Sequence, residues 1–176
     1  MTYKHLTDCQ ESNLVDTAEA MAVTQEHRFC APKEWIQQPP KGKRKRNTDV
    51  SSATYAFETP VSDAGGVTCP GLKVAAHHTR CRRVYHEKTT FTLFRMEEHG
   101  DQLRIVQVEA SFPLPPTGPS SFNWPHVHFG KNRDDLHFSS DTAFPSVSDV
   151  AAYFEKYSNI EFNPHVIDPD EFSLLP

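Results

Sequence analysis

Two histidines in the last third of the chain have a spacing that suits acid–base chemistry. The stretch from Phe122 to Gly130 has the pattern of a short strand and contains His126 and His128. Side chains alternate between the two faces of a strand, so these imidazoles share one face, with attachment points roughly 7 Å apart. Such a pair can bind one phosphate or metal ion, or move protons near neutral pH. His126 and His128 are therefore our candidate catalytic residues, with purely structural histidines as the alternative.

A second stretch places arginines among histidines. The segment from His77 to Arg83 contains Arg80, Arg82 and Arg83, and a guanidinium group can bind a phosphate through two parallel hydrogen bonds. In metal-free phosphodiester chemistry one imidazole takes a proton, another donates one, and arginines neutralise the developing charge. We assign Arg82 and Arg83 to such catalysis and Arg80 to nucleic-acid binding. The alternative is an edge strand whose charges prevent aggregation.

Residues 32–53 have the composition of a linker-like insert. Two consecutive prolines exclude a helix there, and a dense basic run follows. The cations of this run that we assign to nucleic-acid binding are Lys43, Arg44, Lys45 and Arg46. We predict a disordered insert whose basic run contacts nucleic acid or an acidic protein, or acts as a nuclear address. The alternative is a plain solvated loop.

A metal site is a further alternative for the histidine strand. Two histidines and a carboxylate are a familiar catalytic ligand set. The third ligand, beside His126 and His128, would come from Glu109, His99 or His137. The spacing selects none of these three residues, so we assign no metal ligand and identify no cofactor. A phosphate-binding glycine loop, a dinucleotide fingerprint and a nucleophile elbow are all missing from the sequence.

The overall composition limits the class of protein. The 176 residues fit a single domain, 1–176, and the net charge of −5 supplies no global basic field for nucleic acid. Four cysteines without a C-x-x-C pair indicate neither a zinc ribbon nor a redox motif. The first residues lack the apolar core of a signal peptide, and no run approaches the ~18 apolar residues of a membrane span. We expect a soluble cytoplasmic protein with reduced thiols and no membrane contact.

The remaining pattern predicts the elements that position these residues. Thr7 and Gln10 favour the start of a helix that ends between residues 27 and 30, and Ser146 opens a second helix that stops at Asn159. Four segments are predicted strands, namely Thr54–Phe57, Leu72–His78, Thr89–Met96 and Gln102–Ala110, and the last two are rich in β-branched and aromatic residues. The prediction is an α+β fold, a curved antiparallel sheet with one helix near each end.

The segments that connect these elements are also predicted, as turns and loops. Asp63–Gly66 is a predicted turn, and Glu97–Asp101 is a polar, glycine-containing hairpin loop. The proline-rich segment 113–119 is an irregular loop that leads into the histidine strand. We expect Asp134–Ser139 to extend that strand or to pair with it.

Three stretches together carry a resemblance to a known family. Leu6-Thr7-Asp8 leads into a short helix, Arg82-Arg83 precedes a β-hairpin, and Pro125-His126-x-His128 precedes a helix that ends in Tyr157-Ser-Asn159-Ile160. In order and spacing, from about residue 6 to 165, this resembles an uncharacterised family of small bacterial and mobile-element proteins, catalogued as a domain of unknown function. It is also similar, more loosely, to small toxins of toxin–antitoxin pairs with a His-rich strand that are thought to act on RNA.

The resemblance leaves enzymatic activity open. The family tends to carry a His-x-Asn-Pro loop after the second hairpin strand, where this chain has Phe112-Pro-Leu-Pro-Pro116. One hypothesis is a toxin-like nuclease that acts on RNA phosphodiesters. The other is a noncatalytic acidic binding or inhibitor protein, encoded by a phage or another mobile element, that engages a basic protein partner.

Overall fold

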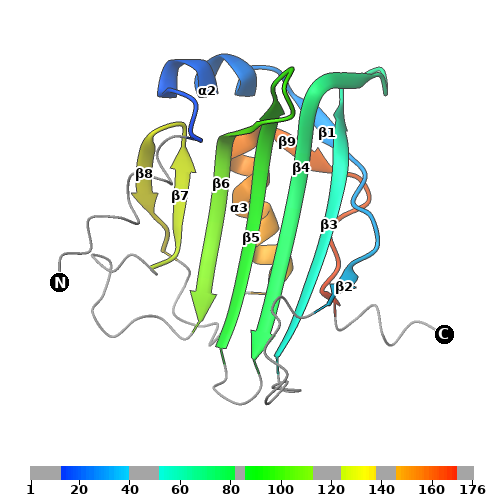
Figure 1. The fold of residues 1–176 in the computed structure, drawn as a ribbon, viewed down its shortest axis with the longest axis vertical. Helices are drawn as coiled ribbons and strands as arrows, with labels where there is room; N and C mark the ends of the chain where they lie inside the picture. The colour runs from blue at the N-terminus through cyan, green and yellow to red at the C-terminus, as the bar shows by residue number, and fades with distance from the viewer. Residues whose placement is uncertain (1–12, 40–51, 82–85, 113–123, 138–145, 170–176) are drawn as a thin grey trace.

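The computed structural model describes residues 13–39, 52–81, 86–112, 124–137 and 146–169. Within these ranges the chain forms one curled sheet of nine strands, accompanied by two helices (Figure 1). The helices are α2 (Thr17–Thr24) and α3 (Val147–Ser158). The strands are β1 (Arg28–Cys30), β2 (Ile36–Gln38), β3 (Ser52–Ser62), β4 (Thr68–Cys81), β5 (His86–Met96), β6 (Gln102–Phe112), β7 (His126–Phe129), β8 (Asn132–Asp135) and β9 (Ile160–Phe162).

The sheet has the strand order β8-β7-β6-β5-β4-β3-β1-β9, and β2 pairs with a separate part of β3. Strands β3 to β8 follow one another along the chain, and each is antiparallel to the next. The predicted α+β class with a curved sheet is therefore correct in outline. The sheet is not wholly antiparallel, because β1 and β9 pair in parallel.

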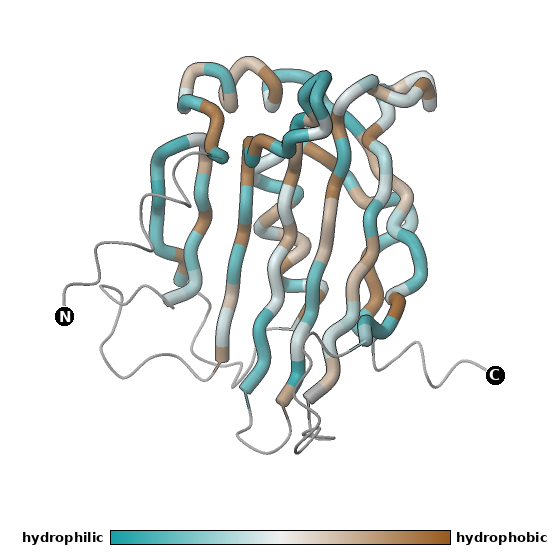
Figure 2. The backbone as a smooth tube through the Cα atoms, in the orientation of Figure 1, coloured by the Kyte–Doolittle hydropathy of each residue, from teal (hydrophilic) through white to brown (hydrophobic). Residues whose placement is uncertain are grey.

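Period-two patterning explains how the long central strands form. In β5 and β6 apolar residues alternate with polar ones, and Figure 2 shows this as alternating brown and teal segments. The hairpin that joins them closes where Gly100 adopts a φ of +86°, and the Gly100 N–H donates to the Glu97 carbonyl at 3.0 Å. The predicted hairpin loop and the predicted turn after β3 both lie where the sequence indicated.

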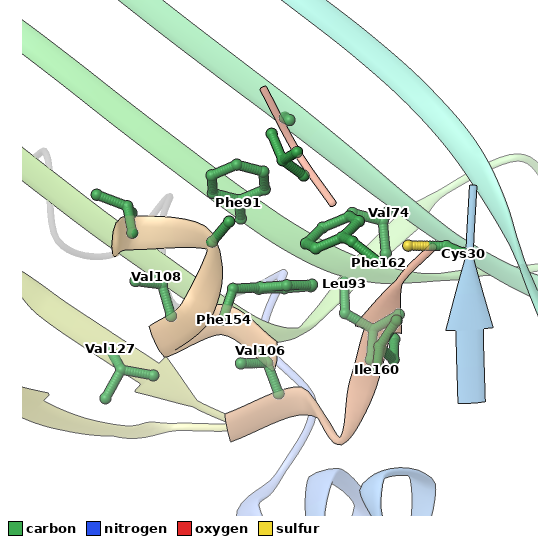
Figure 3. Packing of buried hydrophobic residues seen from close by; sticks show 14 of the residues in the cluster. Cys30, Val74, Phe91, Leu93, Val106, Val108, Val127, Phe154, Ile160 and Phe162 are labelled. Atoms are coloured by element: carbon green, nitrogen blue, oxygen red, sulfur yellow. The ribbon is translucent and has the colours of Figure 1, made fainter. Parts of the chain in front are cut away.

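Helix α3 covers one face of the sheet and closes the core (Figures 1 and 3). Its N-cap Ser146 forms a capping box with Asp149, and Asn159 ends it in the left-handed conformation, as predicted. Phe154 on α3 packs between Phe91 and Phe162, with ring centroids 5.8 Å from each. The apolar side chains of Phe91, Leu93, Val106, Val108 and Val127 on this face are fully buried, and the residues that alternate with them point to the opposite face.

The first predicted helix is wrong in its bounds over the described residues. The predicted start at Thr7 lies outside them, and α2 begins only after Asp16, whose carboxylate accepts a hydrogen bond from the Glu19 N–H at 2.8 Å. Before α2 the chain is extended, because the Val15 N–H donates to the Arg104 carbonyl at 3.1 Å. Leu14 therefore pairs with Arg104 of β6 and Val15 is buried in the core, so neither is part of a helical stripe.

The predicted insert at 32–53 is also corrected at its two ends. Trp35 packs on Phe57 with ring centroids 4.7 Å apart, and its indole N–H donates to the Ile167 carbonyl at 2.8 Å. Strand β2 follows directly, and β3 already begins at Ser52. The basic run, with Lys43, Arg44, Lys45 and Arg46, lies outside the described residues. No helix in the part of the chain that the structure describes is long and apolar enough to cross a membrane.

Candidate functional site

The two candidate histidines lie on β7, on the sheet face opposite α3. His126 is directly across from Glu109 on β6, and His128 is directly across from Gln107. Val127, between them, points into the core beneath α3 and is fully buried (Figure 3). Residues directly opposite in adjacent strands share a face, so the histidines join a polar surface built on β5 to β8.

The β7–β8 hairpin is held in this position at both ends. At its turn the Gly130 N–H donates to the Ile105 carbonyl at 2.8 Å, and Gly130 has a φ of +56°. At its open end the Leu136 N–H donates to the Pro125 carbonyl at 2.8 Å. The indole N–H of Trp124 also donates to the Leu136 carbonyl, at 3.2 Å. These contacts fix the direction in which both imidazoles leave the strand.

The two imidazole rings meet edge to face. Their centroids are 4.9 Å apart and their planes are 87° from each other. Nδ1 of His126 lies 2.6 Å from the Trp124 carbonyl oxygen. A carbonyl oxygen only accepts hydrogen bonds, so Nδ1 of His126 is the protonated nitrogen and donates. In the neutral ring the lone pair is therefore on Nε2.

Burial favours the neutral form of His126. The side chain is 2% exposed, and burial lowers its pKa from the ordinary value for histidine. The hydrogen bond to Trp124 and the carboxylate of Glu109 act in the opposite direction, while Arg133 and Lys88 lower the pKa further. The net direction is downward, so His126 is a neutral base near neutral pH.

His128 is neutral for a stronger set of reasons. Burial, the neighbouring His126, and the guanidinium groups of Arg104 and Arg133 all act together, and they lower the pKa of His128 to about 4. Its Nδ1 is buried and has no hydrogen-bond partner among the residues that the structure describes. A buried polar atom without a partner costs free energy and often marks a functional position.

Charged side chains around the pair form a connected polar network. Lys88 on β5 binds the Glu109 carboxylate at 2.8 Å, and Arg133 on β8 lies 3.6 Å from Asp135. Arg104 donates to the Gln107 side-chain oxygen at 2.6 Å, and the Gln107 amide nitrogen donates to Thr92 at 3.2 Å. The side chains of Arg133 and Lys88 are 28% and 42% exposed, so the network reaches solvent on their side.

Arg80 is not brought to the histidine pair. It lies on β4, three strands from β7, which is roughly 14 Å at ~4.8 Å per strand. Its register places it on the α3 side of the sheet, in line with His78 and Ala76, and its Nε donates to Glu87 at 2.6 Å. The expectation that Arg80 clamps an anion beside His126 and His128 is corrected by this register. Arg82 and Arg83 lie outside the described residues.

His78, beside Arg80 in the sequence, has a structural environment. It is buried on the α3 side of β4, and its Nδ1 is 3.0 Å from the Thr89 hydroxyl. Its ring lies against Trp35 and Tyr55, and burial lowers its pKa. His78 is therefore separated from the β7 pair by the sheet itself.

Sequence reasoning missed four polar side chains of this surface, namely Lys88, Arg104, Gln107 and Arg133. The predicted β5–β6 hairpin could have indicated Lys88 and Arg104, since period-two counting from its loop puts both on one face. Counting from the loop could not have indicated Gln107, because the register shift between Leu93 and Phe94 changes the pairing of β6 beyond Arg104.

The alternative metal site gains no third ligand in the described part of the chain. No three His, Cys, Asp or Glu side chains among those residues converge in a way that could hold an ion. The carboxylate of Glu109 binds Lys88, and His99 lies in the exposed β5–β6 loop. The arrangement instead combines two neutral imidazoles with two guanidinium groups.

Comparisons with known proteins add no assignment. No family model, curated protein or solved structure matches the chain. The resemblance to the uncharacterised mobile-element family therefore stays a prediction.

Proposed function

We propose that this protein acts on the phosphodiester bonds of RNA through the polar face of β6, β7 and β8. The observation that carries the proposal is the pair of imidazoles with centroids 4.9 Å apart, beside Arg104 and Arg133. Two imidazoles and a cationic group are the minimum set for metal-free phosphoryl transfer, in which one ring removes a proton and the other supplies one.

The proposed reaction is an internal transesterification. The ribose 2′-oxygen attacks the adjacent phosphorus, and the bond from that phosphorus to the 5′-oxygen of the next nucleotide breaks. Nε2 of His126 accepts the proton of the 2′-hydroxyl, because its Nδ1 already donates to Trp124. Protonated His128 donates its proton to the leaving 5′-oxygen. The products are a 2′,3′-cyclic phosphate and a 5′-hydroxyl.

The two arginines would stabilise the transition state. Charge builds on the non-bridging oxygens of the phosphorus during the attack, and guanidinium groups fixed nearby lower the energy of that state. Arg133 and Lys88 keep part of their side chains exposed, so a phosphate would approach from their side. The basic run at 43–46 would add sequence-independent contacts to more distant phosphates.

The proposal is tested with labelled RNA and DNA of the same sequence. Wild-type protein is compared with the double variant His126→Asn/His128→Gln, in which the asparagine amide keeps a donor for the Trp124 carbonyl. We expect cleavage of RNA only, since DNA lacks the 2′-hydroxyl, and a fall in rate of about 10²–10⁴-fold in the variant. Equal cleavage of DNA, or an equally active variant with unchanged circular dichroism, would overturn the proposal.

The burial of His126 favours a second candidate, a noncatalytic binding or inhibitor protein. In this candidate the His126 ring, which is 2% exposed and hydrogen-bonded to the Trp124 carbonyl, shapes the surface and takes part in no reaction. The net charge of −5 would then direct the chain to a basic protein partner. The salt dependence of RNA binding separates the two candidates, because phosphate contacts give a steep loss of affinity with salt. A folded protein that neither binds nor cleaves RNA supports the second candidate.

A further inference from the structure

His128 has cationic or polar side chains on both neighbouring strands. Arg133 lies directly opposite on β8, and Gln107 lies directly opposite on β6. Gln107 in turn accepts a hydrogen bond from Arg104 at 2.6 Å. Both guanidinium groups are near enough to act on the charge state of His128. An anion bound beside His128 would therefore lie in the field of both guanidinium groups.

The carboxylates near this point are paired with cations or with a backbone N–H, and the charged groups that act on His128 are Arg104, Arg133 and His126. On the face of the sheet that carries His128, the titratable and charged groups of β5 to β8 include Lys88 on β5, Arg104 and Glu109 on β6, His126 on β7, and Arg133 and Asp135 on β8. Glu109 binds Lys88 at 2.8 Å, and Asp135 is 3.6 Å from Arg133. Asp16, which precedes α2 near the β7–β8 turn, turns its carboxylate to the Glu19 N–H. The field at His128 is therefore positive.

The buried Nδ1 of His128 completes the argument. It has no hydrogen-bond partner in the described ranges of the chain. When His128 is protonated, both of its ring nitrogens carry a proton and can donate. An oxyanion beside the ring would then accept a charge-assisted hydrogen bond from Nδ1 or Nε2. Neutral His128 without an anion leaves Nδ1 unsatisfied, and charged His128 without an anion faces two guanidinium groups. A proton and an anion together would give Nδ1 a hydrogen-bonding role and would offset the charge that His128 gains beside the two guanidinium groups.

We propose that His128 takes up a proton when an oxyanion binds beside Arg104 and Arg133, so that the site binds a phosphate group and a proton together. The inference deepens the proposed function, because the phosphate would be that of RNA. It also accounts for the protonated His128 that the proposed reaction requires. The pKa of His128 is about 4 before binding, whereas the leaving 5′-oxygen needs a protonated donor.

The linkage is reciprocal. If an anion raises the proton affinity of His128, then protonation raises the affinity for the anion by the same factor. As the pH rises, anion affinity should therefore fall by about tenfold for each pH unit. This dependence holds between the pKa of His128 without the anion and its pKa in the complex.

Sulfate is the probe that tests the inference, since it carries no titrating proton in this range. Its binding is measured by calorimetry near pH 6, in two buffers of different ionisation enthalpy, for wild type, His128→Gln and Arg80→Gln. We expect uptake of close to one proton per sulfate in wild type and in Arg80→Gln, whose site is on the other side of the sheet. We expect no proton uptake in His128→Gln. A nuclear magnetic resonance titration should show the His128 ring titrating at higher pH with sulfate present.

Three results would overturn the inference. They are sulfate binding without proton uptake, the same uptake in His128→Gln, and no sulfate binding to the folded wild-type protein. Its failure is distinguishable from failure of the proposed reaction. Proton-linked sulfate binding without RNA cleavage supports the inference and overturns the proposed nuclease reaction. RNA cleavage together with sulfate binding that takes up no proton supports the reaction and overturns the inference.

Discussion

The rings of His126 and His128 lean toward each other on one face of β7, with centroids 4.9 Å apart. At this separation a positive charge on one ring disfavours a charge on the other. Burial contributes most to the lowered pKa of His128, and His126 and the two arginines lower it further. The titrations of the two rings are therefore coupled, and protonation of one disfavours protonation of the other.

The first prediction concerns the pH dependence of stability. The pKa of His128 is lowered to about 4 from 6.5, so between these values the unfolded chain binds more protons than the folded one. The free energy of unfolding then falls as the pH drops through this window, by at most about 1.4 kcal/mol per pH unit for one group. Urea denaturation at several pH values should show a shallower loss in His128→Gln than in wild type. An identical pH profile for the two proteins would contradict the assignment.

The second prediction separates the two sets of arginines. Arg133→Gln should weaken RNA binding and reduce its salt dependence by about one counterion, because it removes one phosphate contact. Arg104→Gln should act in the same direction. Arg80→Gln is the matched control, since Arg80 binds Glu87 on the α3 side of the sheet. If Arg80→Gln weakened RNA binding as much as Arg133→Gln, the phosphate-binding face would be wrongly assigned.

The third prediction concerns the turn that holds β7. A Cβ on Gly130 would lie 2.8 Å from the Asp16 carbonyl oxygen and from Thr17 Cα, and the φ of +56° is strained for any other residue. Gly130→Ala should destabilise the protein by on the order of 3 kcal/mol, and should lower RNA cleavage at temperatures where it is folded.

Gly66 provides the control for this variant. It also has a positive φ, of +78°, but a Cβ there would meet no atom within 4 Å. Gly66→Ala should therefore cost only the backbone strain, about 1–2 kcal/mol. Equal midpoints of urea denaturation for the two variants would show that the close approach of the α2 N-terminus to Gly130 carries no energy.

Local patterns predicted most of the sheet and the second helix. β-Branched and aromatic residues located β5 and β6, the middle of β4 was also predicted, and the serine cap and Asn159 located α3 to within a residue. The first helix was wrong because Leu14 and Val15 fit a helical stripe, yet Leu14 pairs with Arg104 of β6 and Val15 is buried in the core. Tertiary contacts decided this segment, and a local pattern has no access to them.

The sequence alone predicted the two histidines of the site but not its arginines. The spacing of His126 and His128 alone placed both on one face, and the register confirms it. The choice of arginines needed the identity of the neighbouring strands, which proximity in sequence does not supply. Arg80 was selected for its neighbours in the chain, whereas Arg133 is brought to His128 by the β7–β8 hairpin.

The most direct measurement is the identity of the ends left on a labelled RNA after incubation with wild type and with His126→Asn/His128→Gln. A two-histidine transesterification predicts a 2′,3′-cyclic phosphate and a 5′-hydroxyl from wild type, with or without a chelator, and no cleavage above background from the folded variant. Intact RNA with the wild-type protein, or products with a 3′-hydroxyl and a 5′-phosphate, would contradict the assignment of His126 and His128 as base and acid.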